Sequence, residues 1–511
     1  MTNINKLVVA SSLSFCALAL AAVSIGFSAW TYSGSANDER VTIGGTVGDN
    51  WTYEQDGAFY KMNADGSVNW NEQVTPAVFN TKESGGKYYV SSADNPSGTN
   101  VCVYLPTTTG ADNGSHVYDG IDLVVSGSNY VYSLANPTNV IQVYYPLSYS
   151  SFGDAAFYSV DGSNLKEIHA YTPTIGGASE ATSFSVGVTS FFGLDDLSLI
   201  DLPATLTSIS EYAFGTYSTT YADLTISYGS SIFDWIHNVT LSSSWHYGRS
   251  LTVSCTDGDI VYASDSDFEY SVIYNTFAST IQDYTFAGTL DSYGYYPGND
   301  NVLSVTIPEN VTSIGTGAFR TDYSKTTTFP ITYQGSVKNW VTLTKNAGDD
   351  WKKGRILSVD TTEATISFPT QTYLTYSVAF KDTATKIEDE TFINETNLTG
   401  VTFASNIASI GKKSFYGCNN SSFTTARFNT ITVGFIIDEY AFYDCTSLNK
   451  IYVPKNATSI GAYSFAFSVN PGKSGKLSVY YAGRKNTFTN SVAKANYAKN
   501  RSVSITANYT M

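Results

Sequence analysis

The sequence predicts a mainly β fold, most of which is a solenoid of stacked repeats. Three observations favour this class: aromatic and β-branched residues are abundant, no sustained helical periodicity follows the N-terminus, and one short spacing recurs eight times. The 511 residues include 39 Tyr and 28 Phe, but only 14% of them are charged. Aromatic and β-branched side chains fit pleated, half-buried surfaces, so this composition indicates strands.

The N-terminal segment has the features of an export leader. Residues 7–30 carry no charge and follow Lys6. Their densest apolar part, Cys16–Ile25, has the length of a signal-peptide core, although the whole run, about 36 Å as a helix, is also long enough to span a bilayer. We therefore interpret residues 1–36 as a signal peptide or an N-terminal membrane anchor. We expect the remainder to be exported, and cleavage of the leader stays open.

Residues 37–180 are expected to form a β-rich, sandwich-like domain. Short alternating runs separated by Gly, Asn, Asp and Pro predict several strands. These runs are Lys87–Val90, Asn100–Leu105, Asp119–Val125 and Val140–Tyr145. Asp56-Gly57 and Asp65-Gly66 predict hairpin turns, and a turn is favoured over a calcium loop at Asn63 because further acidic ligands are missing. The linker to the next domain is expected near Gly176–Glu180.

From about residue 181 the chain repeats a β-branched aliphatic residue followed five positions later by phenylalanine. The eight pairs are Val186/Phe191, Ile209/Phe214, Ile281/Phe286, Ile314/Phe319, Ile387/Phe392, Ile410/Phe415, Ile437/Phe442 and Ile460/Phe465. Three of the intervals between successive phenylalanines are 23 residues. A period in this range is typical of solenoids, in which each unit buries its apolar face only by stacking on its neighbours.

The fullest unit, Ser447–Phe465, shows how each repeat is expected to fold. Ile451 and Val453 alternate with polar residues, which predicts a strand with one buried face. Pro454 has no N–H for a sheet and ends that strand. Ile460 and Phe465 are then expected to fill the core, and Gly461 to permit the turn between them. The proline, or an alanine in its place, stands 11 residues before the phenylalanine at 203/214, 308/319, 404/415 and 454/465.

This pattern, L-x-x-[IV]-x-[IV]-P-x-x-[VA]-x-[ST]-I-[GS]-x-x-[AS]-F, resembles the BspA-like leucine-rich repeat of bacterial and some protist surface proteins. A second element, in which an aromatic residue stands nine positions after an aliphatic one, is similar to units inserted in that family. It occurs at Ile226–Trp235, Ile331–Trp340 and Val479–Phe488. The resemblance implies a leucine-rich-repeat solenoid with inserted β units and a C-terminal cap over residues 181–511. It further implies a curved, right-handed stack of parallel strands, exposed at the cell surface and used for adhesion or recognition.

The net charge of −16 is unevenly distributed. Residues 31–200 hold 18 acids and 5 bases, whereas the chain from Cys445 onward holds 9 bases and no acid. Overall acidity argues against nucleic-acid binding. The basic end is expected to be either a solvated cap or a contact for an anionic wall polymer. Its cations include Lys473, Lys476, Arg484, Lys485, Lys494, Lys499 and Arg501.

No motif in the sequence carries chemistry. Five cysteines (Cys16, Cys102, Cys255, Cys418 and Cys445) are too scattered for a disulfide framework or a zinc cluster, although Cys418 and Cys445 occupy equivalent positions of their units. The four histidines (His116, His169, His237 and His246) lie outside zinc motifs. Gly472-Lys473-Ser474 lacks the first glycine of a phosphate loop. We therefore predict no catalytic, cofactor or metal residues, and the ligand-binding residues stay unknown.

These features predict an extracellular, non-enzymatic protein, secreted or attached to the cell surface, that binds an extracellular protein or glycan through its solenoid. Membrane contact is expected only through an uncleaved leader. One alternative is a self-associating component of the cell envelope or matrix, suggested by the uneven charge. Another is a glycan hydrolase with its site in residues 37–180, since paired carboxylates are assembled in space. Sequons such as Asn238-Val239-Thr240 and Asn310-Val311-Thr312 matter only in a glycosylating host.

Overall fold

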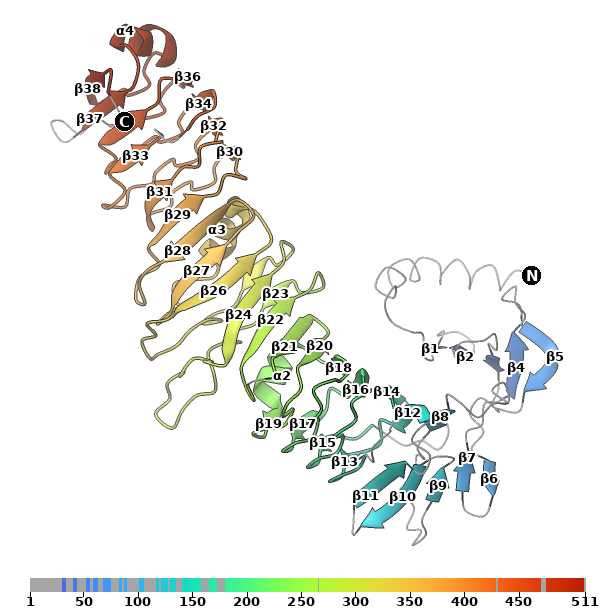
Figure 1. Ribbon diagram of the computed structural model, residues 1–511. Helices are drawn as coiled ribbons and strands as arrows, with labels where there is room; N and C mark the ends of the chain where they lie inside the picture. The colour runs from blue at the N-terminus through green and yellow to red at the C-terminus, as the bar shows by residue number, and fades with distance from the viewer. Residues whose placement is uncertain are drawn as a thin grey trace. The chain divides into compact units, whose positions relative to one another are not determined.

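The structure is a computed structural model that describes residues 140–157, 165–171, 180–264, 266–428, 431–469 and 475–509, with the backbone of separate strands between residues 30 and 134 (Figure 1). Its contacts divide the chain into two units. The first comprises Met1–Thr182, Val186–Ile200 and Ala213–Ala222, and the second comprises Ser183–Ser185, Asp201–Tyr212 and Asp223–Met511. The predicted leader (apart from the strand beginning at Trp30), the predicted linker up to Ser179 and Gly472-Lys473-Ser474 lie outside the described residues. The predicted domain boundary at residue 180 stays a prediction.

The first part of unit one is built from antiparallel strands. They form a five-stranded sheet (β1 to β5), a hairpin (β6 and β7) and a three-stranded sheet (β9 to β11). Their bounds are β1 Trp30–Ser33, β2 Arg40–Ile43, β3 Thr52–Gln55, β4 Ala58–Met62, β5 Val68–Val74, β6 Lys82–Ser84, β7 Lys87–Tyr89, β9 His116–Tyr118, β10 Ile121–Ser126 and β11 Asn129–Leu134. Asp56-Gly57 lies outside the described residues, but the strands on either side pair with Gln55 opposite Ala58. Asn63, Asp65 and Gly66 also lie outside them.

Unit one continues with parallel strands, which begin before residue 181. The strands are β8 (Val101–Tyr104), β12 (Val140–Pro146), β13 (Ser151–Phe152) and β14 (Glu167–Tyr171), and the chain crosses between the units within β15 (Phe184–Val186) and β16 (Leu199–Leu202). β12 pairs in parallel with both β8 and β14. Phe157 stacks on Phe191 with ring centroids 5.4 Å apart, and Phe152, five residues before it, contacts both rings. Phe152 and Phe157 therefore form a ninth pair, which the sequence pattern missed because phenylalanine replaces the β-branched residue.

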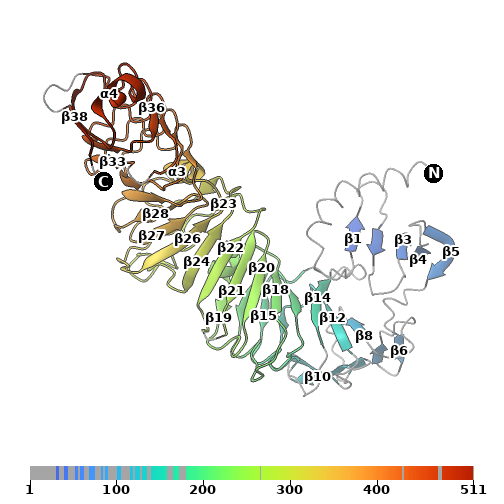
Figure 2. The ribbon, with the colours of Figure 1, turned by 45° about the horizontal axis from the view of Figure 1, so that its top comes forward.

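Unit two is a stack of coils built from longer and shorter strands. Ten longer strands form part of one sheet: β18 (Leu224–Tyr228), β20 (Leu251–Cys255), β21 (Gly258–Tyr262), β22 (Tyr270–Tyr274), β24 (Val302–Ile307), β26 (Thr328–Tyr333), β27 (Ile356–Asp360), β28 (Ala364–Phe368), β29 (Tyr376–Phe380) and β31 (Leu398–Thr402). A second parallel sheet follows: β33 (Thr425–Arg427), β35 (Lys450–Val453), β37 (Lys476–Tyr481) and β38 (Ser502–Ala507). In the C-terminal coils the longer strands lie along one side and the shorter strands along the other (Figures 1 and 2).

Seven of the eight predicted aliphatic residues lie in the shorter strands of unit two, and Val186 lies in β15, a strand of the same kind. The strands that carry them in unit two are β17 (Leu206–Ile209), β23 (Thr280–Ile281), β25 (Ser313–Ile314), β30 (Lys386–Ile387), β32 (Ser409–Ile410), β34 (Phe435–Ile437) and β36 (Ala457–Ile460), whereas the short strand β19 (Thr240–Leu241) carries none. All eight predicted pairs are buried, and each of their phenylalanines is 0% exposed. Phe415 and Phe442 stack with centroids 4.6 Å apart and planes 4° apart, and Phe465 continues the column at 5.0 Å. The predicted mainly β solenoid with shared aliphatic and aromatic plugs is confirmed.

The tight turn before each phenylalanine has a fixed backbone conformation. The residue two positions earlier is left-handed, with φ between 53° and 60°, in all nine units. These residues are Ala155, Thr189, Tyr212, Tyr284, Gly317, Glu390, Lys413, Tyr440 and Tyr463. Only one of them is glycine, so most units bear the roughly 1 kcal/mol or more that a left-handed L-residue costs. Ladder hydrogen bonds offset that cost, as when Glu390 N donates to Lys412 O of the next coil at 3.0 Å.

Gly461 is required for a different reason from the one predicted. Its φ is not positive, but a Cβ there would lie 2.6 Å from Glu439 N of the preceding coil. The equivalent Gly411 would place a Cβ 2.6 Å from the Asp389 carboxylate. Glycine at this position therefore provides clearance between successive coils.

Two longer intervals separate successive repeat phenylalanines, 72 residues from Phe214 to Phe286 and 73 from Phe319 to Phe392. Each interval holds one copy of the same inserted module. Trp235, Trp245 and Phe286 recur 105 or 106 residues later as Trp340, Trp351 and Phe392. Each module contains a short helix, α2 (Ile232–Asn238) or α3 (Val337–Asn346), that carries the first tryptophan, and then two antiparallel strand pairings. The composition did not predict these helices.

Their sequence signal is a serine N-cap, since Ser231 accepts a hydrogen bond from Asp234 N and Ser336 one from Asn339 N. A third inserted unit places α4 (Lys485–Thr487) and the π-helical η2 (Phe488–Val492) between β37 and β38. None of the described helices is long and apolar enough to cross a membrane.

Side chains satisfy buried carbonyl groups between coils. Cys418 Sγ donates to Phe392 O at 3.0 Å and Cys445 Sγ to Phe415 O at 2.9 Å, so the predicted equivalence of the two cysteines is confirmed. Arg355 Nη2 donates to Phe286 O at 3.2 Å in the corresponding place. These side chains are structural because buried carbonyl groups need donors.

In three units an asparagine two residues after the proline position links its coil to the one before. Asn310 Nδ2 donates to Ala278 O at 2.6 Å and to Thr276 O at 3.0 Å. Asn406 and Asn456 make equivalent bonds to main-chain carbonyl groups, Asn406 to Asp382 O and Asn456 to Ile431 O and Val433 O. This row was not predicted, although its constant spacing from Pro308, Ala404 and Pro454 is a sequence signal for it.

Candidate functional site

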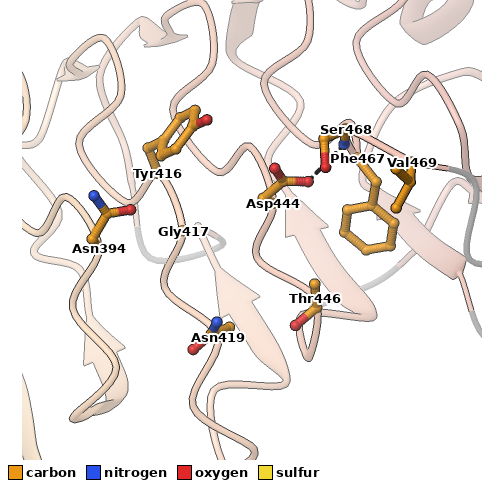
Figure 3. A pocket seen from close by; sticks show the side chains of 9 residues that line it. All are labelled: Asn394, Tyr416, Gly417, Asn419, Asp444, Thr446, Phe467, Ser468 and Val469. Carbon is orange, nitrogen blue, oxygen red and sulfur yellow. Dashed lines mark hydrogen bonds between the residues drawn. The ribbon is translucent and has the colours of Figure 1, made fainter.

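The turns that follow four successive repeat phenylalanines enclose an open groove, which we call the turn groove (Figure 3). Its volume is about 360 Å³. It is lined by Asn394, Tyr416, Gly417, Asn419, Asp444, Thr446, Phe467, Ser468 and Val469. Each lining residue stands one to four positions after Phe392, Phe415, Phe442 or Phe465, so the repeat itself builds the groove.

Main-chain hydrogen bonds fix the floor of the turn groove. Asn394, Gly417 and Asp444 are equivalent residues, and all three have positive φ, between 57° and 73°. Each donates its N–H to a carbonyl group of the next coil, Asn394 to Tyr416 O at 2.6 Å and Gly417 to Tyr443 O at 2.8 Å. A Cβ at Gly417 would lie too close to the Asn394 side-chain oxygen, so a larger residue there would require Asn394 to move. The main-chain bonds therefore join successive turns into one continuous floor.

The side chains of the turn groove are mostly polar or aromatic. Asp444 accepts from Ser468 N at 2.6 Å, while Asn419 and Thr446 are exposed. Tyr416 stacks on Tyr443 with centroids 5.2 Å apart. Burial, with a smaller contribution from Asp444, raises the pKa of Tyr443, so its hydroxyl stays protonated at neutral pH. This arrangement provides hydrogen-bond donors, acceptors and ring edges along an open channel.

A second pocket of about 350 Å³ lies beside the turn that follows Phe286. It is lined by Ile236, His237, Gly288, Thr289, Gly298, Asn299, Asp300 and Asn301. His237 Nε2 lies 3.1 Å from Thr285 O, and burial lowers its pKa, so the imidazole is mainly neutral at pH 7. Asp300 is paired with Lys325 at 2.5 Å. The histidine joins helix α2 to the turn and is oriented by that contact.

The histidines considered in the sequence analysis lie in separate elements. His169 Nε2 lies 2.9 Å from the Glu167 carboxylate in β14, and His116 lies in β9. Buried His246 contacts Arg249 O through Nδ1 at 2.6 Å. Within the described ranges no three His, Cys, Asp or Glu side chains gather closely enough to hold a metal ion. Cys255, Cys418 and Cys445 are buried free thiols, and burial raises the pKa of Cys418 far above its usual value.

The basic residues near the C-terminus have different roles. Arg501 is half-buried, and its guanidinium donates to Phe465 O at 3.4 Å and Gly475 O at 3.3 Å. Burial lowers the pKa of Arg501 to about 10. It is thus a structural donor, like Arg355. Lys476, Arg484, Lys485, Lys494 and Lys499 are exposed, and Lys473 lies outside the described residues.

Comparison with known proteins identifies the repeat. The family model described as the BspA type leucine rich repeat region matches six copies at residues 178–291, 288–339 and 367–475. These matches span 178–339 and 367–475, which is 271 of the 511 residues. No curated protein matches the chain.

Three similar solved structures come from bacteria. A leucine-rich cell-surface protein from Faecalibacterium prausnitzii is 14% identical, with 88% of this chain and 100% of that chain covered and a TM-score of 0.18. A leucine-rich-repeat protein from Bacteroides ovatus is 14% identical, with 90% and 99% covered and a TM-score of 0.24. The pneumococcal vaccine antigen PcpA is 11% identical, with 89% and 98% covered and a TM-score of 0.17. At these scores the likenesses support no further argument about this chain.

Proposed function

Because this chain belongs to the BspA-type leucine-rich-repeat family, we propose that it is a non-enzymatic surface protein that binds an extracellular protein or glycan along the turn groove. One observation carries the proposal: four successive coils contribute polar side chains to one open channel. Adjacent strands lie about 4.8 Å apart, so four coils span roughly 14 Å, which suits a segment of a polymer better than a small enclosed substrate.

Two further features support this function. The main-chain ladder under the turn groove leaves little to order on binding, and a preorganised surface lowers the entropic cost of association. Export is supported by the uncharged run at residues 7–30. Attachment to the surface through that run, or release after its cleavage, is tested by mass spectrometry of the N-terminus of protein from cells and from medium.

The proposal is tested by blocking the turn groove with large side chains. We expect Asn419→Arg combined with Thr446→Arg to weaken binding to a responsive protein or glycan by about tenfold or more, because both exposed residues line the groove. Thr332→Arg with Thr402→Arg is the matched control, since these exposed threonines lie on β26 and β31. Saturable binding across a panel of matrix proteins and glycans is measured by biolayer interferometry. Equal weakening by both double variants, or no saturable binding to any panel member, contradicts the proposal.

Self-association is a second candidate, suggested by the charge distribution. Residues 31–200 carry a net −13 (18 acids, 5 bases) and the chain from Cys445 onward a net +9, so contacts between copies should weaken with salt. Light scattering at low and high salt tests this directly, and a monomer under both conditions eliminates it. Hydrolysis by residues 37–180 is a weaker candidate, which the absence of product from wall and matrix glycans at every pH would eliminate.

A further inference from the structure

The outward face of the C-terminal sheet is basic and aromatic. We call this surface the basic sheet face; it comprises Arg427, Lys450, Tyr452, Lys476, Tyr480 and Tyr509. Strand pairing places Arg427 opposite Tyr452, and Tyr452 opposite Tyr480. Alternation directs Ala426, Ile451 and Val479 into the core, where they are 0% exposed, so their neighbours point to solvent.

The aromatic rings of this face stack on one another. Tyr452 and Tyr480 have centroids 4.6 Å apart and planes 10° apart, and Tyr509 meets both rings edge-on or tilted at 5.4 to 5.5 Å. The Arg427 guanidinium covers the other side of Tyr452 at 4.1 Å. Because the ring faces are occupied and strand side chains stand roughly perpendicular to the sheet, the tyrosines present their hydroxyl groups to a ligand.

The charges on this face are all positive. Arg427, Lys450 and Lys476 are exposed on the successive strands β33, β35 and β37. No Asp or Glu follows Asp444 in the sequence, and no carboxylate of the described residues pairs with these three cations. The face therefore offers cationic and phenolic donors in rows about 4.8 Å apart. This spacing is comparable to the length of one sugar ring.

We propose that the basic sheet face binds an acidic polysaccharide running across the strands. Carboxylate or sulfate groups of the polymer accept hydrogen bonds from the Arg427 guanidinium and the lysine ammonium groups, and sugar hydroxyls bond to Tyr452 and Tyr480. An anionic membrane is disfavoured because the face carries no large apolar side chain for insertion. The site lies on strands, not on the turns that line the turn groove, so it does not depend on the function proposed above.

The test uses polygalacturonate and dextran sulfate, with neutral dextran as the reference. We expect the exported protein to bind both acidic polymers, with an affinity that falls linearly on a log–log plot against salt concentration. Lys450→Glu with Lys476→Glu should weaken that binding by about tenfold or more, since each lysine is a charge-assisted donor. Tyr452→Phe with Tyr480→Phe, which keeps the stack, should weaken it by a few fold. Thermal unfolding verifies that each variant is folded.

Matched controls separate this site from general charge and from the turn groove. Lys485→Glu with Lys494→Glu makes the same charge change near the C-terminus but off the sheet, and should leave binding within about twofold. Asn419→Arg with Thr446→Arg should not weaken polymer binding, so the two proposals fail independently. The inference is overturned if the protein binds neither polymer, if both lysine pairs weaken binding equally, or if anionic phospholipid vesicles or DNA bind as tightly at the same salt. It is also overturned if the Lys450/Lys476 pair changes self-association but not polymer binding.

Discussion

At several repeat positions the residue type depends on the space that the neighbouring coil leaves for a side chain. In four units the residue after the buried aliphatic is glycine (Gly187, Gly315, Gly411 and Gly461); its backbone angles are ordinary, but a Cβ there would lie 2.4 to 2.6 Å from atoms of the preceding coil. The residue two positions before each phenylalanine has a positive φ, yet only Gly317 among these nine residues is glycine. At these positions glycine therefore follows the clearance between coils more closely than it follows the sign of φ.

Gly411→Ala should lower the free energy of unfolding by about 1–3 kcal/mol, because the new Cβ would lie 2.6 to 2.7 Å from the Asp389 carboxylate and the Ile387 carbonyl oxygen. Gly400→Ala is the matched control, since nothing lies within 4 Å of its Cβ. Urea unfolding of the two variants measures the difference. Equal stability of the two variants would show that the coils separate freely to admit a methyl group.

Individual residues show which parts of the structure the sequence predicted and which it did not. The spacing from Ile460 to Phe465 predicted the core because buried side chains that stack on their equivalents in the next coil must recur at a fixed place in each repeat. The pair at Phe152 and Phe157 was missed because phenylalanine stands at position 152, where the other units have a β-branched residue. The left-handed turns left no signal, since residues as different as Ala155 and Lys413 occupy them. The residues that line the turn groove could not be predicted either, because residues such as Asn419 and Thr446 come close together only when the coils stack.

At the element scale, the two inserted modules have the same order of helix and strands, but they differ in how a buried tryptophan N–H is hydrogen-bonded. In the first, Trp235 Nε1 donates to the Tyr262 hydroxyl at 3.0 Å. In the second, Phe368 occupies the place of Tyr262, and Trp340 Nε1 has no hydrogen-bond partner among the described residues. A buried donor without a partner costs about 1–3 kcal/mol.

Tyr262→Phe should therefore destabilise the first module by about 1–3 kcal/mol, because it leaves the Trp235 indole unsatisfied as well. The reciprocal change, Phe368→Tyr, should stabilise the second module by about 1 kcal/mol if its hydroxyl reaches Trp340. Thermal unfolding of both single variants provides the comparison. A rise in Tm for Tyr262→Phe would contradict the assignment of this bond.

The modules also differ at one buried titratable position, because His246 in the first module corresponds to Lys352 in the second. Burial lowers the pKa of Lys352 to about 8, below its value of 10.5 in an unfolded chain. Between these values the unfolded chain binds more protons than the folded one at this site, so the contribution of Lys352 to stability should rise as the pH increases from about 8. Burial also raises the pKa values of the Cys255 and Cys418 thiols, which oppose this trend from about pH 8, where unfolded cysteine ionises. Buried tyrosines such as Tyr270 and Tyr376 have raised pKa values and oppose it near pH 10, where unfolded tyrosine ionises.

The slope of the unfolding free energy against pH between about pH 8 and 9.5, measured by urea unfolding, should therefore be more positive in the parent protein than in Lys352→Met, because the buried thiols contribute equally to both. The control is Lys338→Met, since Lys338 lies at the start of α3 and its side chain is only partly buried. Equal slopes in the parent and in both variants would show that Lys352 is not desolvated in the folded protein.

At the scale of the whole molecule, each coil is stabilised mainly by the coils on either side. Stability in such arrays is close to a sum of unit terms and nearest-neighbour terms. The column from Phe392 to Phe465 is one such run of neighbours, and within unit two the inserted module at 224–286 lies several coils away from it.

Phe442→Ala should thus cost about 3–5 kcal/mol, because it opens a cavity between two stacked rings. Hydrogen–deuterium exchange should accelerate over 431–469 and stay unchanged over 224–264. Tyr443→Ala, which removes a partly exposed ring from the next position, should have a smaller effect. Uniform acceleration along unit two would show that the array unfolds as a single cooperative block.

The row of asparagines between coils has a consequence for the choice of expression host. Asn310 and Asn456 each belong to an Asn-x-Thr sequon, and in the folded protein their amide groups are already bonded to main-chain carbonyl groups. A eukaryotic secretory pathway attaches its sugar to the nascent chain, before those bonds form. A glycan at either asparagine would replace one of the two amide hydrogens that bond to the preceding coil and would place a bulky group between adjacent coils. Antigen or display material made in such cells will therefore misfold in proportion to its glycan occupancy at these two asparagines, whereas material from a non-glycosylating bacterium will not.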